Sequence, residues 1–183
     1  MSNNVVYFID CDNNGLYKST ANIEKLDNKL LSPRFCTGNE DSAANYRLRF
    51  DTLNGDEDTP SVDIYVTKKM LHDIFVEGIK YVILTKNCYS TKICNTVYPD
   101  ERCYYKSHYN IRNNIIFKLL YNKPYTLLCN ISIKPASNNK SILIETKFYY
   151  KFFYIKHKPI ANSTKTIVLT NDEAEKLMAK IKN

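Results

Sequence analysis

Two carboxylates near the amino terminus have a spacing suited to phosphate chemistry. Asp10 and Asp12 directly follow the apolar run from Val5 to Ile9, and the next three residues, Asn-Asn-Gly, favour a turn. At the end of a strand, one carboxylate can attack phosphorus while its neighbour acts as an acid or a base. The pattern therefore allows a metal-dependent phosphatase. The alternative is a strand followed by a turn rich in aspartate and asparagine.

The segment VVYFIDCDNNG resembles the first motif of haloacid-dehalogenase-like phosphatases, and YVILTKN, with Thr85 after its apolar run, resembles their second motif. The resemblance implies that Asp10 is the nucleophile and Asp12 the acid or base. It covers only these two stretches. The family's glycine and threonine after Asp-x-Asp, its later paired acids and its alternating helices are all missing, so a metal would lack ligands. We therefore expect no enzyme, no catalytic residue, no cofactor and no metal.

The cysteine spacings do not indicate a zinc site. Cys88, Cys94 and Cys103 lack the two-residue gaps of zinc knuckles, and His108 and His157 could complete a site only through folding. Because the amino terminus lacks a secretory leader, we expect an intracellular protein, in the cytoplasm or nucleus, with reduced cysteines. The chain has six cysteines: Cys11, Cys36, Cys88, Cys94, Cys103 and Cys129.

The positive charge is concentrated in the second half of the chain. The formal net charge is +7, and the segment from Arg102 to Lys165 holds 12 basic residues and one acid, Glu145. Such a field attracts phosphates or an acidic protein surface. Lysines that alternate with aromatic rings also suit single-stranded nucleic acid, because lysines follow the backbone while rings stack on bases. The candidate binding residues are Arg102, Lys106, Arg112, Lys147, Tyr149, Lys151, Phe153, Lys156 and Lys158.

A simpler reading treats these lysines as a solvated basic face over core aromatics in a lysine-rich protein. The lysines at positions 147, 151, 156 and 158 would then oppose edge-to-edge pairing of strands.

The segments that carry the binding residues of the ribbon are predicted to be β-strands. Between Ser141 and His157, β-branched and aromatic residues recur at every second position from Ile142 to Tyr154, which predicts one long strand, or two joined at a bulge, with one buried face. The stretch from Tyr125 to Ile133 alternates in the same way. Between them, Lys134 to Lys140 is rich in turn-forming residues, so the sequence predicts an antiparallel hairpin. Phe148, Tyr150 and Phe152 are predicted to face the core.

Shorter segments extend this reading. Strands are predicted at Tyr46–Phe50, Val62–Val66, Ile79–Thr85, Ile115–Tyr121 and Thr166–Leu169, as well as Val5–Ile9. Residues 16–43 are predicted to form a long connection with one helical turn around Ile23–Leu31. The segment Lys68–Gly78 fits either a single helical turn or a bent connection, and Asn87–Tyr109 is predicted to be irregular.

The last segment changes to a helical period. Ala174, Leu177, Met178 and Ile181 form one apolar stripe, and Thr170 with Glu173 has the spacing of a capping box. We predict a helix over about residues 171–182.

These elements predict one domain over residues 1–183, mainly β, with an antiparallel β-sandwich or barrel-like fold and a C-terminal α-helix. No apolar run approaches the roughly 18 residues that a spanning helix needs, so no membrane partner is expected. The oligomeric state is not indicated.

In its size, its strand series from Ala44 to Thr85 and its later β-ribbon, the chain resembles the telokin-like proteins of baculoviruses. The richness in Tyr, Asn, Ile and Lys is also typical of large A+T-rich DNA viruses. The resemblance implies a small, β-rich intracellular accessory protein and assigns no functional residue. The leading hypothesis is a non-enzymatic viral interaction protein whose basic ribbon face contacts an acidic partner. The alternatives are a single-stranded nucleic acid binder and an Asp-x-Asp phosphatase.

Overall fold

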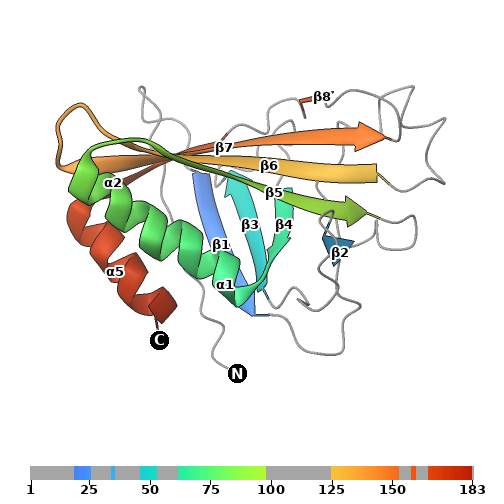
Figure 1. Ribbon diagram of the computed structural model, residues 1–183, viewed down its shortest axis with the longest axis horizontal. Helices are drawn as coiled ribbons and strands as arrows, with labels where there is room; N and C mark the ends of the chain where they lie inside the picture. Colours follow the sequence, from blue (N-terminus) through green and yellow to red (C-terminus); the bar gives the residue numbers. More distant parts are fainter. Residues whose placement is uncertain are drawn as a thin grey trace.

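The computed structural model describes residues 19–25, 34–35, 46–52, 62–97, 125–152, 158–159 and 165–182. Within these residues the chain forms two antiparallel sheets, which meet in a sandwich-like arrangement, and two helical segments (Figure 1). The predicted class, mainly β with a C-terminal helix, is confirmed. The strands predicted at Val5–Ile9 and Ile115–Tyr121 lie outside the described residues.

The first sheet has the strand order β1-β3-β4. Its strands are β1 (Ser19–Lys25), β3 (Tyr46–Thr52) and β4 (Val62–Val66). Ile23, Leu48 and Ile64 lie opposite one another in the register and are buried, so one apolar row crosses the whole sheet. The strands predicted over the second and third of these segments are confirmed.

Strand β1 differs from the prediction of a connection with a helical turn near Ile23–Leu31. Its backbone pairs with β3 along the full length from Ser19 to Lys25. The local sequence is weakly periodic, and the ladder to a distant strand decides the conformation.

The second sheet is larger, with the order β2-β5-β6-β7-β8 and with β9 also paired to β7. All its ladders are antiparallel. Its strands are β2 (Arg34–Phe35), β5 (Tyr89–Val97), β6 (Tyr125–Pro135), β7 (Ser141–Phe152), β8 (Lys158–Pro159) and β9 (Lys165–Thr170). Strand β5 lies in a segment that was predicted to be irregular, whereas the final strand was predicted correctly.

The central hairpin of β6 and β7 is confirmed. A turn over residues 136–140 joins the two strands, with the Ala136 amide donating to the Ser141 carbonyl at 2.9 Å and Asn139 in the left-handed region at φ 55°. Asparagine tolerates this conformation better than most residues. The buried face of β7 is the predicted one: Ile142, Ile144, Thr146 and Phe148 are all buried. The side chains of Tyr150 and Phe152 are not described, and the rest of the predicted strand, residues 153–157, lies outside the described residues.

One continuous helical segment follows β4 and corrects one of the predicted strands. It consists of α1 (Lys68–His72), the π-helical segment η1 (Asp73–Gly78) and α2 (Ile79–Thr85). The strand predicted over α2 is therefore wrong. Of the two alternatives left open for Lys68–Gly78, the helical one is found, as part of a longer helix. The strand prediction failed because the sequence was divided at Gly78. The apolar residues have a helical spacing that is recognisable only when the segments before and after Gly78 are taken together. The buried stripe is Leu71, Ile74, Phe75, Ile79 and Val82.

The C-terminal helix α5 (Asn171–Lys182) has the predicted cap. The Thr170 amide donates to the Glu173 carboxylate at 2.8 Å, and the Glu173 amide donates to the Thr170 hydroxyl oxygen at 3.2 Å. This reciprocal pair satisfies two amides that a helix start leaves without partners. Ala174, Leu177 and Met178 are buried, as the apolar stripe predicted.

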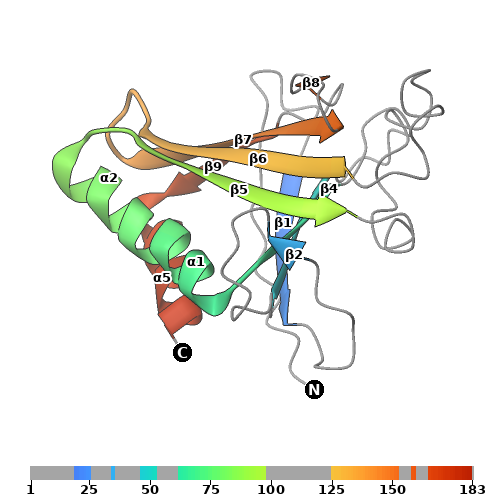
Figure 2. The ribbon, with the colours of Figure 1, turned by 45° about the vertical axis from the view of Figure 1, so that its right-hand side comes forward.

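The first sheet and both helical segments lie on the same side of the second sheet (Figures 1 and 2). One buried apolar cluster joins all three parts. Asn95, fully buried on β5, ties the two sheets together: its Nδ2 donates to the Tyr65 carbonyl at 3.1 Å, and its Oδ1 accepts from the Tyr65 amide at 2.8 Å. The side-chain amide thus pairs with β4 as a neighbouring strand would.

Gly78 allows the helical segment to approach β5. A Cβ atom at this position would lie 2.8 Å from two ring carbons of Tyr89. Alanine favours a helix over glycine by about 1 kcal/mol, but forcing the ring away costs about 1–3 kcal/mol. We expect Gly78→Ala to lower the free energy of urea unfolding by about 1 kcal/mol. In a Tyr89→Ala background the same change should be stabilising; destabilisation in both backgrounds would contradict the ring contact.

Candidate binding face on the second sheet

The side of the second sheet that faces away from the first sheet and the helices carries polar, basic and partly apolar side chains. Successive residues of a strand lie on opposite sides of the sheet. This side therefore carries the residues that alternate with the buried ones. We call it the outer face. It consists of Ser90, Lys92 and Cys94 on β5, Thr126, Leu128, Asn130, Ser132 and Lys134 on β6, Leu143, Glu145, Lys147, Tyr149 and Lys151 on β7, and Thr166 and Val168 on β9.

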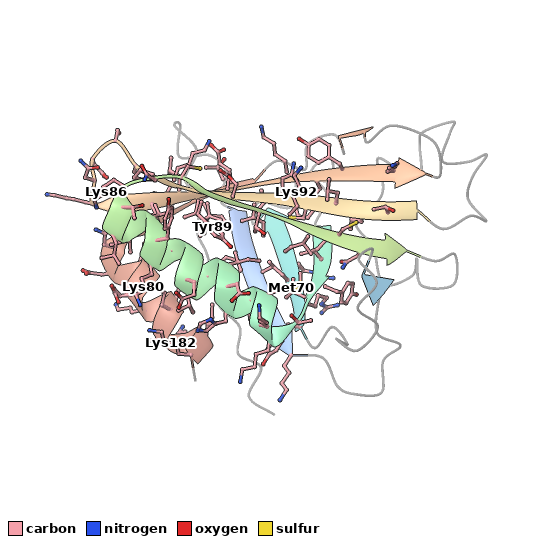
Figure 3. All side chains as sticks on the ribbon, viewed as in Figure 1. Met70, Lys80, Lys86, Tyr89, Lys92 and Lys182 are labelled. Atoms are coloured by element: carbon pink, nitrogen blue, oxygen red, sulfur yellow. The ribbon has the colours of Figure 1, made fainter. Side chains whose placement is uncertain are left out.

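Three exposed lysines dominate this face. The register places Lys92 and Lys147 on either side of Asn130, with their strands about 10 Å apart. Lys151 lies two positions beyond Tyr149 on the same strand as Lys147, about 13 Å along it. Within the described part of the chain, none of these lysines has a carboxylate within salt-bridge distance. Figure 3 labels Lys92 on the second sheet, whereas Lys80 and Lys182 belong to the helices.

An apolar pair lies between the lysines. Leu128 on β6 is directly opposite Tyr149 on β7, and both side chains are partly exposed. Directly opposed residues have Cβ atoms about 5 Å apart, so leucine and tyrosine form a small shelf. The outer face therefore combines point charges with a surface on which a flat group can stack.

Glu145, the one acid between Arg102 and Lys165, is paired with a lysine on the neighbouring strand. Lys134 Nζ donates to Glu145 Oε2 at 2.8 Å across the β6–β7 ladder. This hydrogen bond and the carboxylate charge raise the pKa of Lys134 above its usual value. Glu145 therefore does not cancel the charge of Lys147, which lies two positions away on the same face.

The first sheet has a different charge pattern. Its register places Arg47 opposite Glu24 and Arg49 opposite Asp63, so acids and bases alternate across the strands. Cross-strand neighbours of opposite charge are favourable, and they reduce the net field of a surface. The three exposed lysines of the outer face have no acid directly opposite them in the β5–β6 and β6–β7 ladders.

The structure brings together only some of the predicted binding residues. Lys147, Tyr149 and Lys151 share the outer face. Lys158 lies on β8 opposite Tyr150, and its side chain is not described. Arg102, Lys106, Arg112, Phe153 and Lys156 lie outside the described residues.

Sequence reasoning missed Lys92, because the segment of β5 was predicted to be irregular. A weak signal was present: Tyr89, Thr91 and Ile93 alternate with Ser90 and Lys92. The position of Asn130 between two lysines depends on the pairing of its strand with two other strands.

The enzymatic and metal hypotheses gain no support. Thr85 lies at the end of helix α2 rather than after a strand, so the second phosphatase-like motif is not formed. Asp10 and Asp12 lie outside the described residues. Among the residues that the structure covers, no group of three or more His, Cys, Asp or Glu side chains could hold a metal ion.

The described cysteines are not alike. Cys88 and Cys129 carry free thiols, whereas Cys94 is disulfide-bonded, which differs from the expectation of reduced cysteines. Burial raises the pKa of the Cys129 thiol, so it stays protonated and acts as a core residue. The Cys88 thiol lies 3.3 Å from the Ser132 hydroxyl at the edge of the outer face.

Comparisons with known proteins leave the function open. No protein-family model matches the sequence, and no curated protein does. A solved structure described as the plant transcriptional regulator PBF-2 is similar at a TM-score of 0.45 and 11% identity, covering 97% of this chain and 79% of that chain. A likeness at this level assigns neither family nor function. Over the part of the chain that the structure describes, no helix has the length and apolar character to cross a membrane.

Proposed function

We propose that the protein is a non-enzymatic binding protein whose outer face contacts an acidic partner, and that this partner is a single-stranded nucleic acid. The observation that carries the proposal is the set of three exposed lysines around Leu128 and Tyr149, none of which pairs with a carboxylate of a described residue. The viral accessory role suggested by composition and resemblance stays a prediction.

The spacing of these groups supports a strand-like ligand. Lys147 and Lys151 lie on the same strand with Tyr149 midway, so a phosphate chain along β7 could meet both ammonium groups while a base stacks on the ring. Stacking of a base on an aromatic side chain contributes about 1–3 kcal/mol, and each neutralised phosphate adds binding that salt weakens.

An acidic protein surface is the second candidate. Leu128 and Tyr149 with surrounding lysines also match the usual arrangement of a protein interface, which has an apolar centre and a charged rim. Binding of a single-stranded nucleic acid requires base stacking on Tyr149 and phosphate contacts with the lysines, whereas binding of an acidic protein requires neither stacking nor phosphate.

Fluorescence anisotropy with a labelled single-stranded oligonucleotide of mixed sequence, about 20 nucleotides long, tests the proposal. We expect binding at about 50 mM salt that falls steeply by about 200 mM salt. The double variant Lys147→Glu/Lys151→Glu should weaken binding by about tenfold or more and reduce the salt slope by about 0.7 for each lysine.

The matched control is Lys176→Glu/Lys180→Glu, which makes the same charge change on exposed positions of α5, on the opposite side of the second sheet. This control should change affinity far less. Equal losses in both double variants would show a non-specific charge effect and contradict the assigned face. Absence of binding to the oligonucleotide together with binding to polyglutamate, lost in Lys147→Glu/Lys151→Glu, would favour the acidic protein instead.

A further inference from the structure

Asn130 occupies the centre of the outer face and carries a polar atom that no described residue pairs with. It lies on β6, the strand between β5 and β7, with Lys92 on one side and Lys147 on the other. Its Oδ1 is shielded from solvent and accepts no hydrogen bond from any described residue.

An unsatisfied, shielded acceptor is unfavourable for folding, because the atom loses its water without gaining a donor. Asparagine is also depleted in strands, where β-branched residues fit better. Neither packing nor strand propensity explains asparagine at this position. A ligand that supplies a donor would explain it.

Resting on the proposed function, we infer that Asn130 selects adenine among the bases of a bound single strand. Asn130 is the diagonal cross-strand neighbour of Tyr149, at about 7–8 Å, so a base stacked on the tyrosine ring can bring its edge to the amide. The adenine edge that carries N6 and N7 offers a donor beside an acceptor, which matches the Oδ1 and Nδ2 atoms of asparagine.

The other bases match this pair of atoms less well on the same edge. Guanine presents two acceptors there, thymine an acceptor and a methyl group, and cytosine a donor without an adjacent acceptor. The neighbouring lysines also suit this role. Lys92 and Lys147 have long, exposed side chains on either side of Asn130, so they can meet the phosphates that flank the bound base.

The test compares oligo(dA), oligo(dT) and oligo(dA) containing 7-deazaadenine, all of equal length, bound to the full chain and to Asn130→Val. We expect the unchanged protein to prefer oligo(dA) over oligo(dT) by about tenfold. The preference should fall when N7 is replaced, and it should vanish in Asn130→Val. Because valine removes the unsatisfied acceptor and suits a strand, Tm should rise by about 2–4 °C, which separates lost recognition from lost folding.

Equal binding of oligo(dA) and oligo(dT), or a preference that persists in Asn130→Val, would overturn this inference while leaving the proposed function intact. Failure of the protein to bind any of the three oligonucleotides would overturn both together. A lower Tm for Asn130→Val would show that the asparagine has a structural role and would also contradict the inference.

Discussion

Replacing Asn95 by leucine should lower the free energy of unfolding by about 2–5 kcal/mol, a large part of the roughly 5–15 kcal/mol that holds a typical domain folded. Leucine has a similar volume but no polar atoms, so the Tyr65 amide and carbonyl would remain buried without partners. Urea unfolding monitored by tyrosine fluorescence would measure the loss. A change below about 0.5 kcal/mol, the scale of an ordinary surface substitution, would show that water replaces the lost bonds.

The variant Asn95→Asp separates hydrogen bonding from packing. A protonated carboxyl group can donate to the Tyr65 carbonyl and accept from its amide, as the native side chain does, whereas the ionised form cannot donate. Burial raises the pKa of such a group in the folded state above its unfolded value. The variant's stability relative to the native chain should therefore be greatest below the unfolded pKa of aspartate and fall as pH rises through the folded pKa. A difference from the native chain that does not change with pH would contradict this account.

Replacing Phe148 by alanine should cost about 3–5 kcal/mol, while the same change at the adjacent Tyr149 should cost less than about 1 kcal/mol. Phe148 is 1% exposed and lies on the inner side of the second sheet, opposite Cys129 in the register. Tyr149 lies on the outer face and is only partly buried. The two residues are neighbours in the chain but lie on opposite faces of the sheet. The difference between their free energies of unfolding therefore reports which face is buried, and not where along the strand the change was made.

Equilibrium unfolding in urea measures both variants. Phe148→Leu is the conservative control and should cost less than Phe148→Ala, because it leaves a smaller cavity. Equal costs for Phe148→Ala and Tyr149→Ala would indicate that β7 is shifted by one residue, which would move Lys147 and Lys151 to the inner side and remove the proposed binding face.

The parts of the fold that were predictable are those whose pattern is local. In β6 and β7 the residues of the buried face, nearly all apolar, occupy every second position, and a short turn joins the strands, so the hairpin and its buried face followed from the sequence. The C-terminal helix was equally clear, because its cap and apolar stripe agree.

The parts that were not predictable depend on distant partners or on an unusual local geometry. Strand β1 has little pattern of its own and is held by β3. The helix over residues 68–85 contains a glycine and a π-helical segment, and its apolar stripe is recognisable only over the whole segment, so IKYVILT taken alone resembles a buried strand.

The candidate site likewise contains residues that a local pattern predicts and residues that only strand pairing brings together. Lys147, Tyr149 and Lys151 were found because they alternate along one strand. The row from Lys92 through Asn130 to Lys147 belongs to three strands, and only the register between them brings it together. No spacing within the sequence encodes that row.

The way β7 receives its partners has a consequence for synthesis on the ribosome. The hairpin with β6 can close as soon as both strands have emerged, because only the short turn separates them. The inner side of β7 also contacts α5, and its far edge pairs with β9, both of which are made later. Until residues 165–182 have left the exit tunnel, an apolar ribbon with an unpaired edge stays open, and the nascent chain is most exposed to misassociation at that stage.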